Sequence, residues 1–205
     1  MAAFIVFEGI DGSGKSTQSR ALYRRLLRGD FPALLTHEPG GTPLGESLRR
    51  WVKRRQGLFP LTELYLFNAA RAQLVEQVIR PALANGATVL ADRYIASTVA
   101  YQSYGRGLDL NLVQQANRGA AGGLSPDLTV FLDVPPELGG ARKGKGGQDN
   151  FDSAPLEFHH RVRQGYLDQA IAQAKEAGPD WLVLDGSRSR TLLAEEIWAK
   201  VQPLL

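Results

Sequence analysis

A glycine-rich stretch near the start of the chain has the residue types and the spacing that bind a polyphosphate. Gly9, Gly14, Lys15 and Ser16 fit the pattern G-x-x-x-x-G-K-[ST]. Glycines allow backbone N–H groups to approach an anion, and the helix expected over residues 17–27 points its partly positive N-terminus at the same place. Lys15 would add a mobile charge to the β- and γ-phosphates, and the Ser16 hydroxyl would supply a ligand for Mg²⁺. The stretch therefore predicts a site for nucleotide phosphates.

Two residues at the end of a predicted strand extend this chemistry. The apolar run over 88–91 is typical of a parallel strand buried on both faces, and Asp92 and Arg93 follow it. Ligands gather at the carboxyl ends of strands in open parallel sheets, so this acid and arginine are well placed for Mg²⁺ and phosphate. If a helix begins directly afterwards, Arg93, Ser97 and Tyr101 share one face. That face is polar where a core face should be apolar, although a structural role stays open.

An aromatic ring and a guanidinium share a face of another expected helix. The pattern begins near Thr62, its expected N-cap, and places Phe67 and Arg71 four residues apart. Taken alone, the pair favours core packing edged by a surface arginine. The helix expected over 44–55 carries five basic residues, and for most of them a solvated face is the better interpretation.

A glycine- and lysine-rich segment over 139–147 carries Arg142, Lys143 and Lys145. Its composition is not expected to hold a stable helix, and it has nothing to bury. It is either a disordered surface loop or a basic flap that folds over phosphates when they are bound.

The elements that must position these groups alternate between strand and helix. Strands are expected at 4–8, 31–36, 88–91, 128–133 and 181–184, and helices at 17–27, 44–55, from 62 onward, 110–118, 155–177 and 191–201. This order predicts an α/β fold of three layers, α/β/α, with a central, mostly parallel five-stranded sheet. Without a repeat or an interdomain linker, we expect one domain over 1–205 with a small flexible lid at about 139–155.

Composition excludes several classes of function. Lys plus Arg is 24 and Asp plus Glu is 21, so the net charge of +3 is too small to indicate nucleic-acid binding. The absence of cysteine excludes disulfides and thiol nucleophiles, and the three histidines lack metal-ligand spacing. No apolar run approaches a membrane span and no signal-peptide layout is present, so a cytoplasmic location is expected.

Several separated motifs together resemble one family, the bacterial thymidylate kinases. These are P-loop nucleoside monophosphate kinases that convert dTMP to dTDP with ATP and Mg²⁺. The resemblance covers most of the chain and rests on Phe-Glu-Gly-Ile-Asp-Gly-Ser-Gly-Lys-Ser-Thr at 7–17, Glu-Pro-Gly-Gly-Thr at 38–42, the segment 67–71, Asp-Arg-Tyr at 92–94 with Ser97, Ala-Tyr-Gln at 100–102, and Phe158 with Arg-Val-Arg-Gln-Gly-Tyr at 161–166. It implies a P-loop NTPase fold, a homodimer, and ATP and dTMP as small-molecule substrates, with no nucleic acid or membrane as partner.

The resemblance also implies roles for residues that would bind the base and sugar. Phe67 would stack on thymine and Arg71 would donate to its carbonyl edge. Gln102 would contact the base as well, and Tyr101 would lie under the deoxyribose, where a 2′-hydroxyl would crowd it.

A second implied group surrounds the phosphates. On the dTMP side, Arg49 and Arg93 would hold the phosphate, and Asp11, Glu38 and Ser97 would complete the polar lining. On the ATP side, the implied contacts are Gly9, Ile10, Asp11, Gly12, Ser13, Gly14, Lys15, Ser16, Thr17 and Arg142. Ser16 and Asp92 would bind Mg²⁺, and the expected catalytic residues are Lys15, Asp92, Arg93, Arg142 and Lys145.

The chain departs from the family pattern at the lid and beside one substrate loop. His37 stands where the family usually has an arginine before Glu-Pro-Gly-Gly, so one positive charge is missing or depends on pH. The lid's usual Asp-Arg-x-Glu reads Asp-Asn-Phe-Asp at 149–152, with Asn150 in place of the arginine. Arg142, Lys143 and Lys145 would then share the task of stabilising the transition state.

Two alternatives stay open from the sequence. One is a nucleotide kinase of the same fold that acts on dUMP, dCMP or a deoxynucleoside. The other is a P-loop switch or partitioning protein, which is disfavoured because the chain has no Asn-Lys-x-Asp guanine-reading motif and because the polar face of Arg93, Ser97 and Tyr101 would lack a purpose.

Overall fold

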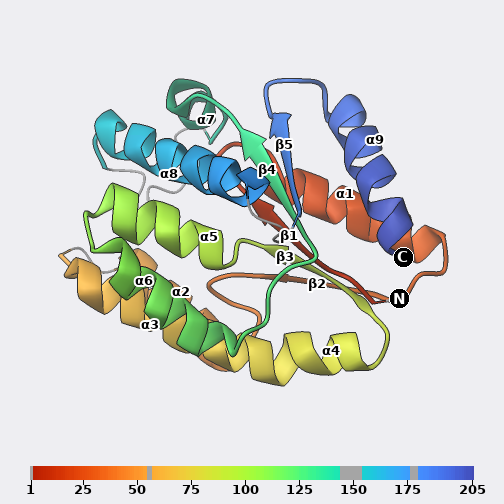
Figure 1. Cartoon of the computed structure of the whole chain (residues 1–205), viewed down its shortest axis with the longest axis horizontal. Coiled ribbons are helices and arrows are strands. Elements are labelled where there is room, and N and C mark those ends of the chain that lie inside the picture. Colours follow the sequence, from red (N-terminus) through yellow and green to blue (C-terminus); the bar gives the residue numbers. More distant parts are fainter. Residues whose placement is uncertain (1, 55–56, 144–153, 176–179) are drawn as a thin grey trace.

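A five-stranded parallel sheet forms the centre of the computed structural model, which describes residues 2–54, 57–143, 154–175 and 180–205 (Figure 1). The strands are β1 (Phe4–Glu8), β2 (Ala33–His37), β3 (Thr88–Asp92), β4 (Leu128–Asp133) and β5 (Asp180–Asp185). They lie in the order β2-β3-β1-β4-β5, and every described pair is parallel. The predicted sheet and all five of its strands are confirmed.

Strand β1 is buried on both faces because it lies at the middle of the sheet. Ile5 and Phe7 pack on one side with α1 (Lys15–Arg28) and α9 (Arg190–Val201), which is followed by a short 3₁₀ turn, Gln202–Leu204. Phe4 and Val6 face the opposite side, in a cluster with residues of α3 (Pro60–Leu74), a π-helical segment (Val75–Ile79) and α6 (Leu110–Ala121). The alternation of these side chains gives the three layers seen in Figure 1.

The remaining helices cover the side of the sheet that carries α3. They are α2 (Pro43–Arg54), α4 (Arg80–Ala84), α5 (Ile95–Thr98) with a π-helical continuation (Val99–Gly105), α7 (Pro136–Lys143) and α8 (Leu156–Lys175). Helix α8 packs on the π-helical continuation of α5, and Figure 1 shows both above α6 and α3.

Register brings the carboxyl ends of three strands to one edge. Asp92 on β3 lies beside Phe7 on β1 and beside His37 on β2. The residues that follow these positions, Glu8 and Arg93 among them, therefore emerge close together. This is the edge at which the sequence predicts ligands to gather.

Two local expectations are wrong. Helix α3 begins at Pro60 rather than after Thr62, because proline is favoured in the first turn of a helix, where its missing N–H is not needed. Residues 139–143, expected to be non-helical, belong to α7. Glycine is needed at position 139 because a Cβ there would lie 2.6 Å from the carbonyl oxygen of Asp11. This glycine therefore allows close packing of α7 on the phosphate loop and does not make the segment flexible.

Candidate active site

The phosphate loop, residues 9–14, leaves β1 and ends at the first turn of α1. Gly12 and Gly14 have φ angles of 77° and 97°, which favour glycine. A Cβ on Gly12 would lie 2.1 Å from the carbonyl oxygen of Gly139, so α7 touches the loop backbone directly. The first two residues of the loop, Gly9 and Ile10, are buried, and Ile10 packs with the core beneath α8. Ser13 is buried as well, whereas Asp11, Gly12 and Gly14 are partly exposed.

Three adjoining cavities follow the carboxyl edge of the sheet, and we call them the loop, middle and inner cavities. The loop cavity, of about 510 Å³, is lined by Gly12, Ser13, Gly14, Lys15, Ser16, Thr17, Gln18, Arg142, Gly186, Arg188, Ser189, Arg190 and Leu193. The middle cavity, of about 340 Å³, is lined by Asp11, Lys15, Ser16, Ser19, Arg20, Leu35, Thr36, His37, Glu38, Arg49, Asp92 and Arg93. The inner cavity is lined by Asp11, Glu38, Pro39, Arg49, Val52, Phe67, Arg71, Arg93, Ser97, Thr98, Tyr101 and Gln102.

Shared residues connect the three spaces. Lys15 and Ser16 line both the loop and the middle cavities, and Asp11, Arg49 and Arg93 line both the middle and the inner cavities. Residues predicted from distant parts of the sequence are thus brought around one continuous path.

Lys15 is a buried cation at the junction of the loop and middle cavities. Its Nζ lies 3.3 Å from Asp11 Oδ1 and 3.3 Å from the carbonyl oxygen of Ile10. Burial lowers the pKa of Lys15 and the nearby Arg93 lowers it further, while Asp11 and Asp92 oppose both. A positive charge with so little water around it is well suited to bind an anionic oxygen.

Ser16 and Asp92 supply oxygen atoms on the wall of the middle cavity. Ser16 Oγ donates to Asp92 Oδ2, whereas Asp92 Oδ1 is buried and has no hydrogen-bond partner among the described residues. In the described part of the chain, no group of three or more acidic, histidine or cysteine side chains could hold a metal ion by itself. One carboxylate and one hydroxyl still fit Mg²⁺, because this ion keeps several waters and takes other ligands from substrate phosphates.

Arg93 donates hydrogen bonds to four side chains around the site. Its Nη2 donates to Asp11 Oδ1 at 2.5 Å and to Tyr101 Oη at 3.2 Å, and its Nη1 donates to Ser97 Oγ at 3.0 Å and to Tyr166 Oη at 3.1 Å. Arg93, Ser97 and Tyr101 therefore meet as the spacing predicts. The path between them is not a regular helix, since Arg93 precedes α5 with a φ of 77° and Tyr101 lies in the π-helical continuation.

Glu8, which was not among the site residues predicted from the sequence, supports this cluster from the end of β1. The side chain is fully buried, and its Oε1 accepts from the backbone N–H of Tyr94 at 2.9 Å. Its Oε2 accepts from Ser97 Oγ at 2.6 Å and from Tyr166 Oη at 3.1 Å. Burial raises the pKa of Glu8, and these hydrogen bonds together with Arg93 oppose the rise. The sequence signal that could have identified Glu8 is an acidic residue at the end of an otherwise apolar strand.

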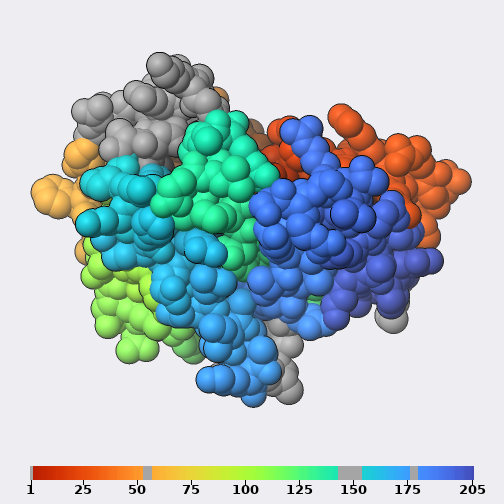
Figure 2. Space-filling view, turned by 90° about the horizontal axis from the view of Figure 1, so that it is seen from above, coloured from red at the N-terminus to blue at the C-terminus, as the bar shows by residue number. Residues whose placement is uncertain are grey.

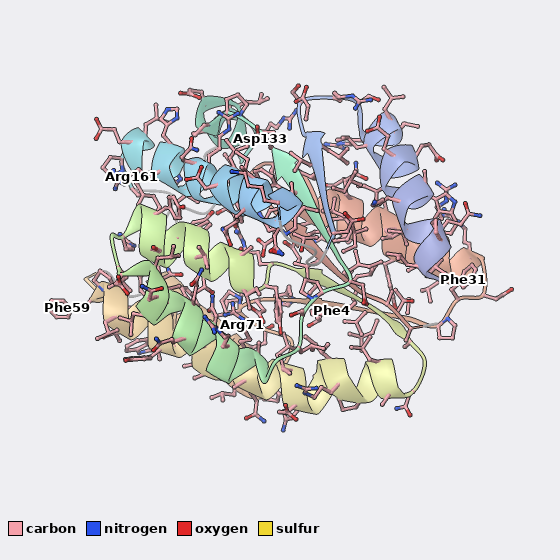
Figure 3. The ribbon with its side chains drawn as sticks, viewed as in Figure 1. Phe4, Phe31, Phe59, Arg71, Asp133 and Arg161 are labelled. Atoms are coloured by element: carbon pink, nitrogen blue, oxygen red, sulfur yellow. The ribbon has the colours of Figure 1, made fainter. Side chains whose placement is uncertain are left out.

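Arg71 is buried, so the expectation of a surface arginine is wrong (Figure 3). Its Nη2 lies 2.7 Å from Glu38 Oε2, and its Nε donates to the same carboxylate at 2.9 Å. The remaining N–H groups reach Asn68 Oδ1, Asn117 Oδ1, Thr98 Oγ1 and the carbonyl oxygen of Tyr94. All five N–H groups of the guanidinium are therefore engaged. Phe67, one turn earlier on α3, lines the inner cavity.

Gln102 reaches the inner cavity with its amide anchored at one end. Its Nε2 donates to Glu63 Oε2 at 3.3 Å, and Arg106 Nη2 donates to Glu63 Oε1 at 3.0 Å. An ionised carboxylate only accepts hydrogen bonds, so the amide nitrogen must face Glu63. Glu63 was not among the site residues predicted from the sequence.

Arg49 and His37 lie around the loop that follows β2. Arg49 Nη1 donates to the carbonyl oxygen of Pro39 at 3.1 Å. His37 Nε2 lies 2.9 Å from Glu46 Oε1 on α2, and both side chains are partly exposed. His37 also lines the middle cavity, so the residue that replaces the family arginine stays at the site.

Helix α7 brings one predicted lid cation to the loop cavity. Arg142 Nη1 donates to the carbonyl oxygen of Gly186 at 2.8 Å, so α7 is joined to the segment that follows β5. Figure 2 shows the teal surface of α7 next to the blue surface of the C-terminal part of the chain. Lys145 and Asn150 lie outside the described residues.

Comparison with known proteins gives a consistent result along the whole chain. A family model described as thymidylate kinase matches residues 7–197. The thymidylate kinase of Dehalococcoides mccartyi strain 195 is 47% identical over 207 residues, covering 100% of this chain and 98% of the relative. That of Deinococcus radiodurans is 48% identical over 200 residues, covering 97% and 95%.

A solved structure has the same fold. The crystal structure of thymidylate kinase from Ehrlichia chaffeensis superposes with a TM-score of 0.78 at 36% identity, covering 98% of this chain and 99% of the other. Among the described helices, none has both the length and the apolar character needed to cross a lipid bilayer.

Proposed function

Because the chain belongs to the thymidylate kinase family, we propose that its cavities hold ATP and dTMP with their phosphates meeting in the middle cavity. The enzyme transfers the γ-phosphoryl group of ATP to dTMP and forms dTDP, a step of nucleotide biosynthesis. The observation that carries the proposed placement is the continuous path from the phosphate loop to an inner cavity that an aromatic ring lines. Lys15 and Arg93 lie where its parts join.

ATP binds along the loop cavity in this proposal. Residues 9–17 surround the β- and γ-phosphates, with backbone N–H groups of the loop and the N-terminus of α1 directed at them. Arg142 and the segment after β5 flank the nucleoside, an arrangement supported by their place on the cavity wall. Lys15 Nζ turns from Asp11 to the γ-phosphate when ATP enters.

dTMP occupies the inner cavity, with its phosphate in the middle one. Phe67 stacks on thymine, Gln102 presents its amide oxygen to the base, and Tyr101 lies beneath the sugar. Arg71 contacts the carbonyl edge of the base by exchanging or sharing the partner of one of its five engaged N–H groups. Support for the stacking comes from the position of Phe67 on the cavity wall.

The dTMP phosphate lies between Arg49 and Arg93. Both arginines line the middle and inner cavities, as do Asp11 and Glu38, and Ser97 borders the inner one. The carboxylate of Asp11 holds Arg93 in place until an anion arrives.

Ser16 and Asp92 would hold Mg²⁺ beside the phosphates. The ion would neutralise charge on the transferred group and fix its orientation. The buried, unbonded Asp92 Oδ1 supports this assignment.

The reaction is an in-line transfer without a covalent enzyme intermediate. The oxygen of the dTMP phosphate attacks the γ-phosphorus of ATP, the bond between this phosphorus and the β,γ-bridging oxygen breaks, and ADP leaves. The acceptor oxygen is already anionic, so no strong general base is required, and the chain supplies alignment and positive charge. Lys15, Arg93 and Arg142, with Lys145 of the lid, spread the developing charge. Asp92 would hold Mg²⁺, which would supply further positive charge beside the phosphates.

We further propose that residues 1–205 act as one kinase domain with a lid at about 139–155, and that the enzyme works as a cytoplasmic homodimer. Exposed apolar side chains on α3 support the dimer: Leu61 and Tyr65 are 41% and 54% exposed and lie one turn apart, and Phe59 before the helix is 79% exposed. Figure 3 shows Phe59 projecting from the edge of the molecule. Apolar groups of this size on one surface are typical of an interface.

Release of ADP, measured against a panel of acceptors, tests the proposed substrate site. We expect rapid turnover with dTMP, slower turnover with dUMP, and little with dCMP or thymidine. Turnover with thymidine but not with dTMP would remove the phosphate-binding role of Arg49 and Arg93. Slow phosphate release that is independent of any acceptor would favour a nucleotide switch instead.

A further inference from the structure

Glu8 occupies an unusual position for an acid. It ends the central strand, is fully buried, and lies directly beneath the turn that carries Arg93. Its Oε1 accepts from two backbone N–H groups of that turn, those of Tyr94 at 2.9 Å and Ser97 at 3.2 Å. Its Oε2 accepts from the hydroxyls of Ser97 and Tyr166. One carboxylate therefore ties β1, the start of α5 and helix α8 together.

Chemistry limits the directions in which the hydrogen bonds of this cluster can run. A guanidinium can only donate and an ionised carboxylate can only accept. Arg93 Nη1 donates to Ser97 Oγ at 3.0 Å and to Tyr166 Oη at 3.1 Å. Each hydroxyl must then turn its proton away from Arg93, and Glu8 Oε2 lies 2.6 Å from Ser97 Oγ and 3.1 Å from Tyr166 Oη. The two hydroxyls also lie 2.8 Å apart, so one of them can donate to the other, but at least one of the two protons goes to Glu8. The carboxylate thus keeps both hydroxyl oxygens available as acceptors for the arginine.

The backbone at Arg93 needs such support. Its φ of 77° lies in a region that residues other than glycine rarely adopt, so the turn persists only where its surroundings hold it. Burial also raises the pKa of Glu8, and a carboxyl group with a raised pKa in the folded state loses its contribution to stability as the pH rises through that pKa. Ionisation of Glu8 therefore costs stability, and its hydrogen bonds to Ser97, Tyr94 and Tyr166, together with Arg93, oppose that cost.

We infer that Glu8 is a positioning residue for phosphoryl transfer, acting through Ser97 and Tyr166 to aim the Arg93 guanidinium at the reacting phosphates. The inference rests on the proposed role of Arg93. Glu8 does not touch either substrate. It fixes the turn through two backbone N–H groups and orients the guanidinium through two hydroxyls.

The substitution Glu8→Gln tests this relay. The amide nitrogen replaces an acceptor with a donor, so the hydroxyls of Ser97 and Tyr166 are driven to turn their protons toward Arg93. We expect kcat to fall by at least about tenfold, with KM for ATP changed by less than about threefold, because the ATP side of the site is untouched. The control Val130→Ala truncates a core side chain in the cluster beneath α1 and α9, and should lower the melting temperature with kcat retained at assay temperature.

A double-mutant cycle separates positioning from general structural support. In an Arg93→Ala background, Glu8→Gln should reduce kcat by less than about twofold further, because the group through which Glu8 acts is already gone. Tyr166→Phe keeps the ring and removes one hydroxyl of the relay. It should lower kcat in the parent enzyme but reduce kcat by less than about twofold further in the Arg93→Ala background, and it replaces Glu8→Gln if that variant folds poorly.

The outcomes distinguish the two levels of the proposal. If Arg93→Ala impairs turnover but the effects of Glu8→Gln and Arg93→Ala multiply, the relay is wrong while the proposed site stands. If Arg93→Ala leaves kcat intact, the proposed role of Arg93 fails and the relay fails with it. An unchanged kcat in both Glu8→Gln and Tyr166→Phe also overturns the inference.

Discussion

Replacing Arg71 with methionine should destabilise the protein strongly, before any question of substrate binding arises. The Arg71 and Glu38 side chains are 2% and 6% exposed, and their closest atoms are 2.7 Å apart. Removing one partner of such a pair leaves an uncompensated buried charge, which costs about 3–5 kcal/mol. For a chain of this length, each kcal/mol lowers the melting temperature by about 2–4 °C, so we expect a decrease of about 6–20 °C.

The loss should depend on pH in a definite direction. Burial raises the pKa of Glu38 from its ordinary value of 4.5, and Arg71 opposes that rise. Without Arg71 the pKa rises further, so stability is retained at low pH, where Glu38 is protonated in both states, and is lost as the pH rises through the folded-state value. The free energy of unfolding that Arg71→Met loses relative to the parent chain should therefore be smaller near pH 5 than near pH 8. The difference amounts to ~1.4 kcal/mol for each unit by which the substitution raises the pKa of Glu38.

Urea and thermal unfolding of the ligand-free protein, followed by circular dichroism, measure both effects. The double variant Arg71→Met/Glu38→Met should recover much of the loss, because no isolated charge stays buried. The control Arg80→Met removes an exposed arginine paired with Glu76 and should cost at most about 1 kcal/mol. A single-variant loss below about 1 kcal/mol, a double variant no better than the single one, or a deficit that grows in acid would refute the reasoning.

Three further substitutions test the proposed substrate contacts by steady-state kinetics. Lys15→Ala should lower kcat/KM by at least about a hundredfold, the scale of one preorganised charge, whereas Lys200→Ala, at an exposed pair on α9, should not. Phe67→Ala should raise KM for dTMP with kcat less affected, and Phe31→Ala, a partly exposed ring in the loop between α1 and β2, is its control; an unchanged KM would count against stacking. Tyr101→Ala should lower the ratio of kcat/KM for dTMP to kcat/KM for the ribonucleotide. An unchanged ratio would show that Tyr101 does not exclude the 2′-hydroxyl.

The sheet was predictable because its signals are local and strong. Continuous apolar runs such as 88–91 and 128–133 can be satisfied only by burial on both faces, which parallel strands between helices provide. The phosphate loop was predictable for the same reason, because its glycines are required by the positive φ angles of a short stretch of backbone.

The lid helix could not be read from composition. Two adjacent glycines lower helix propensity, and the pattern at 139–143 therefore predicts a loop. The structure overrides it because the backbones of Gly139 and Gly12 touch, and Leu138 packs on the core beneath α8. The contact joins residues more than a hundred positions apart, so no local window contains it.

The supporting roles of three buried acids were not predicted: Glu8 and Glu63 were not identified as site residues, and Glu38 was expected only as part of the polar lining near the dTMP phosphate. Glu8, Glu38 and Glu63 come from a strand end, a loop and a helix, and each is at most 6% exposed. Glu8 and Glu63 lie behind side chains that face the cavities: Glu8 supports the Arg93 guanidinium through hydroxyls, and Glu63 accepts from the Gln102 carboxamide. Glu38 itself lines the middle and inner cavities and accepts directly from the Arg71 guanidinium. A glutamate considered alone predicts a solvated surface, because burial of its charge is unfavourable without a partner. The partners are supplied by distant elements, so the sequence could indicate which residues meet the substrates but not which residues hold them in place.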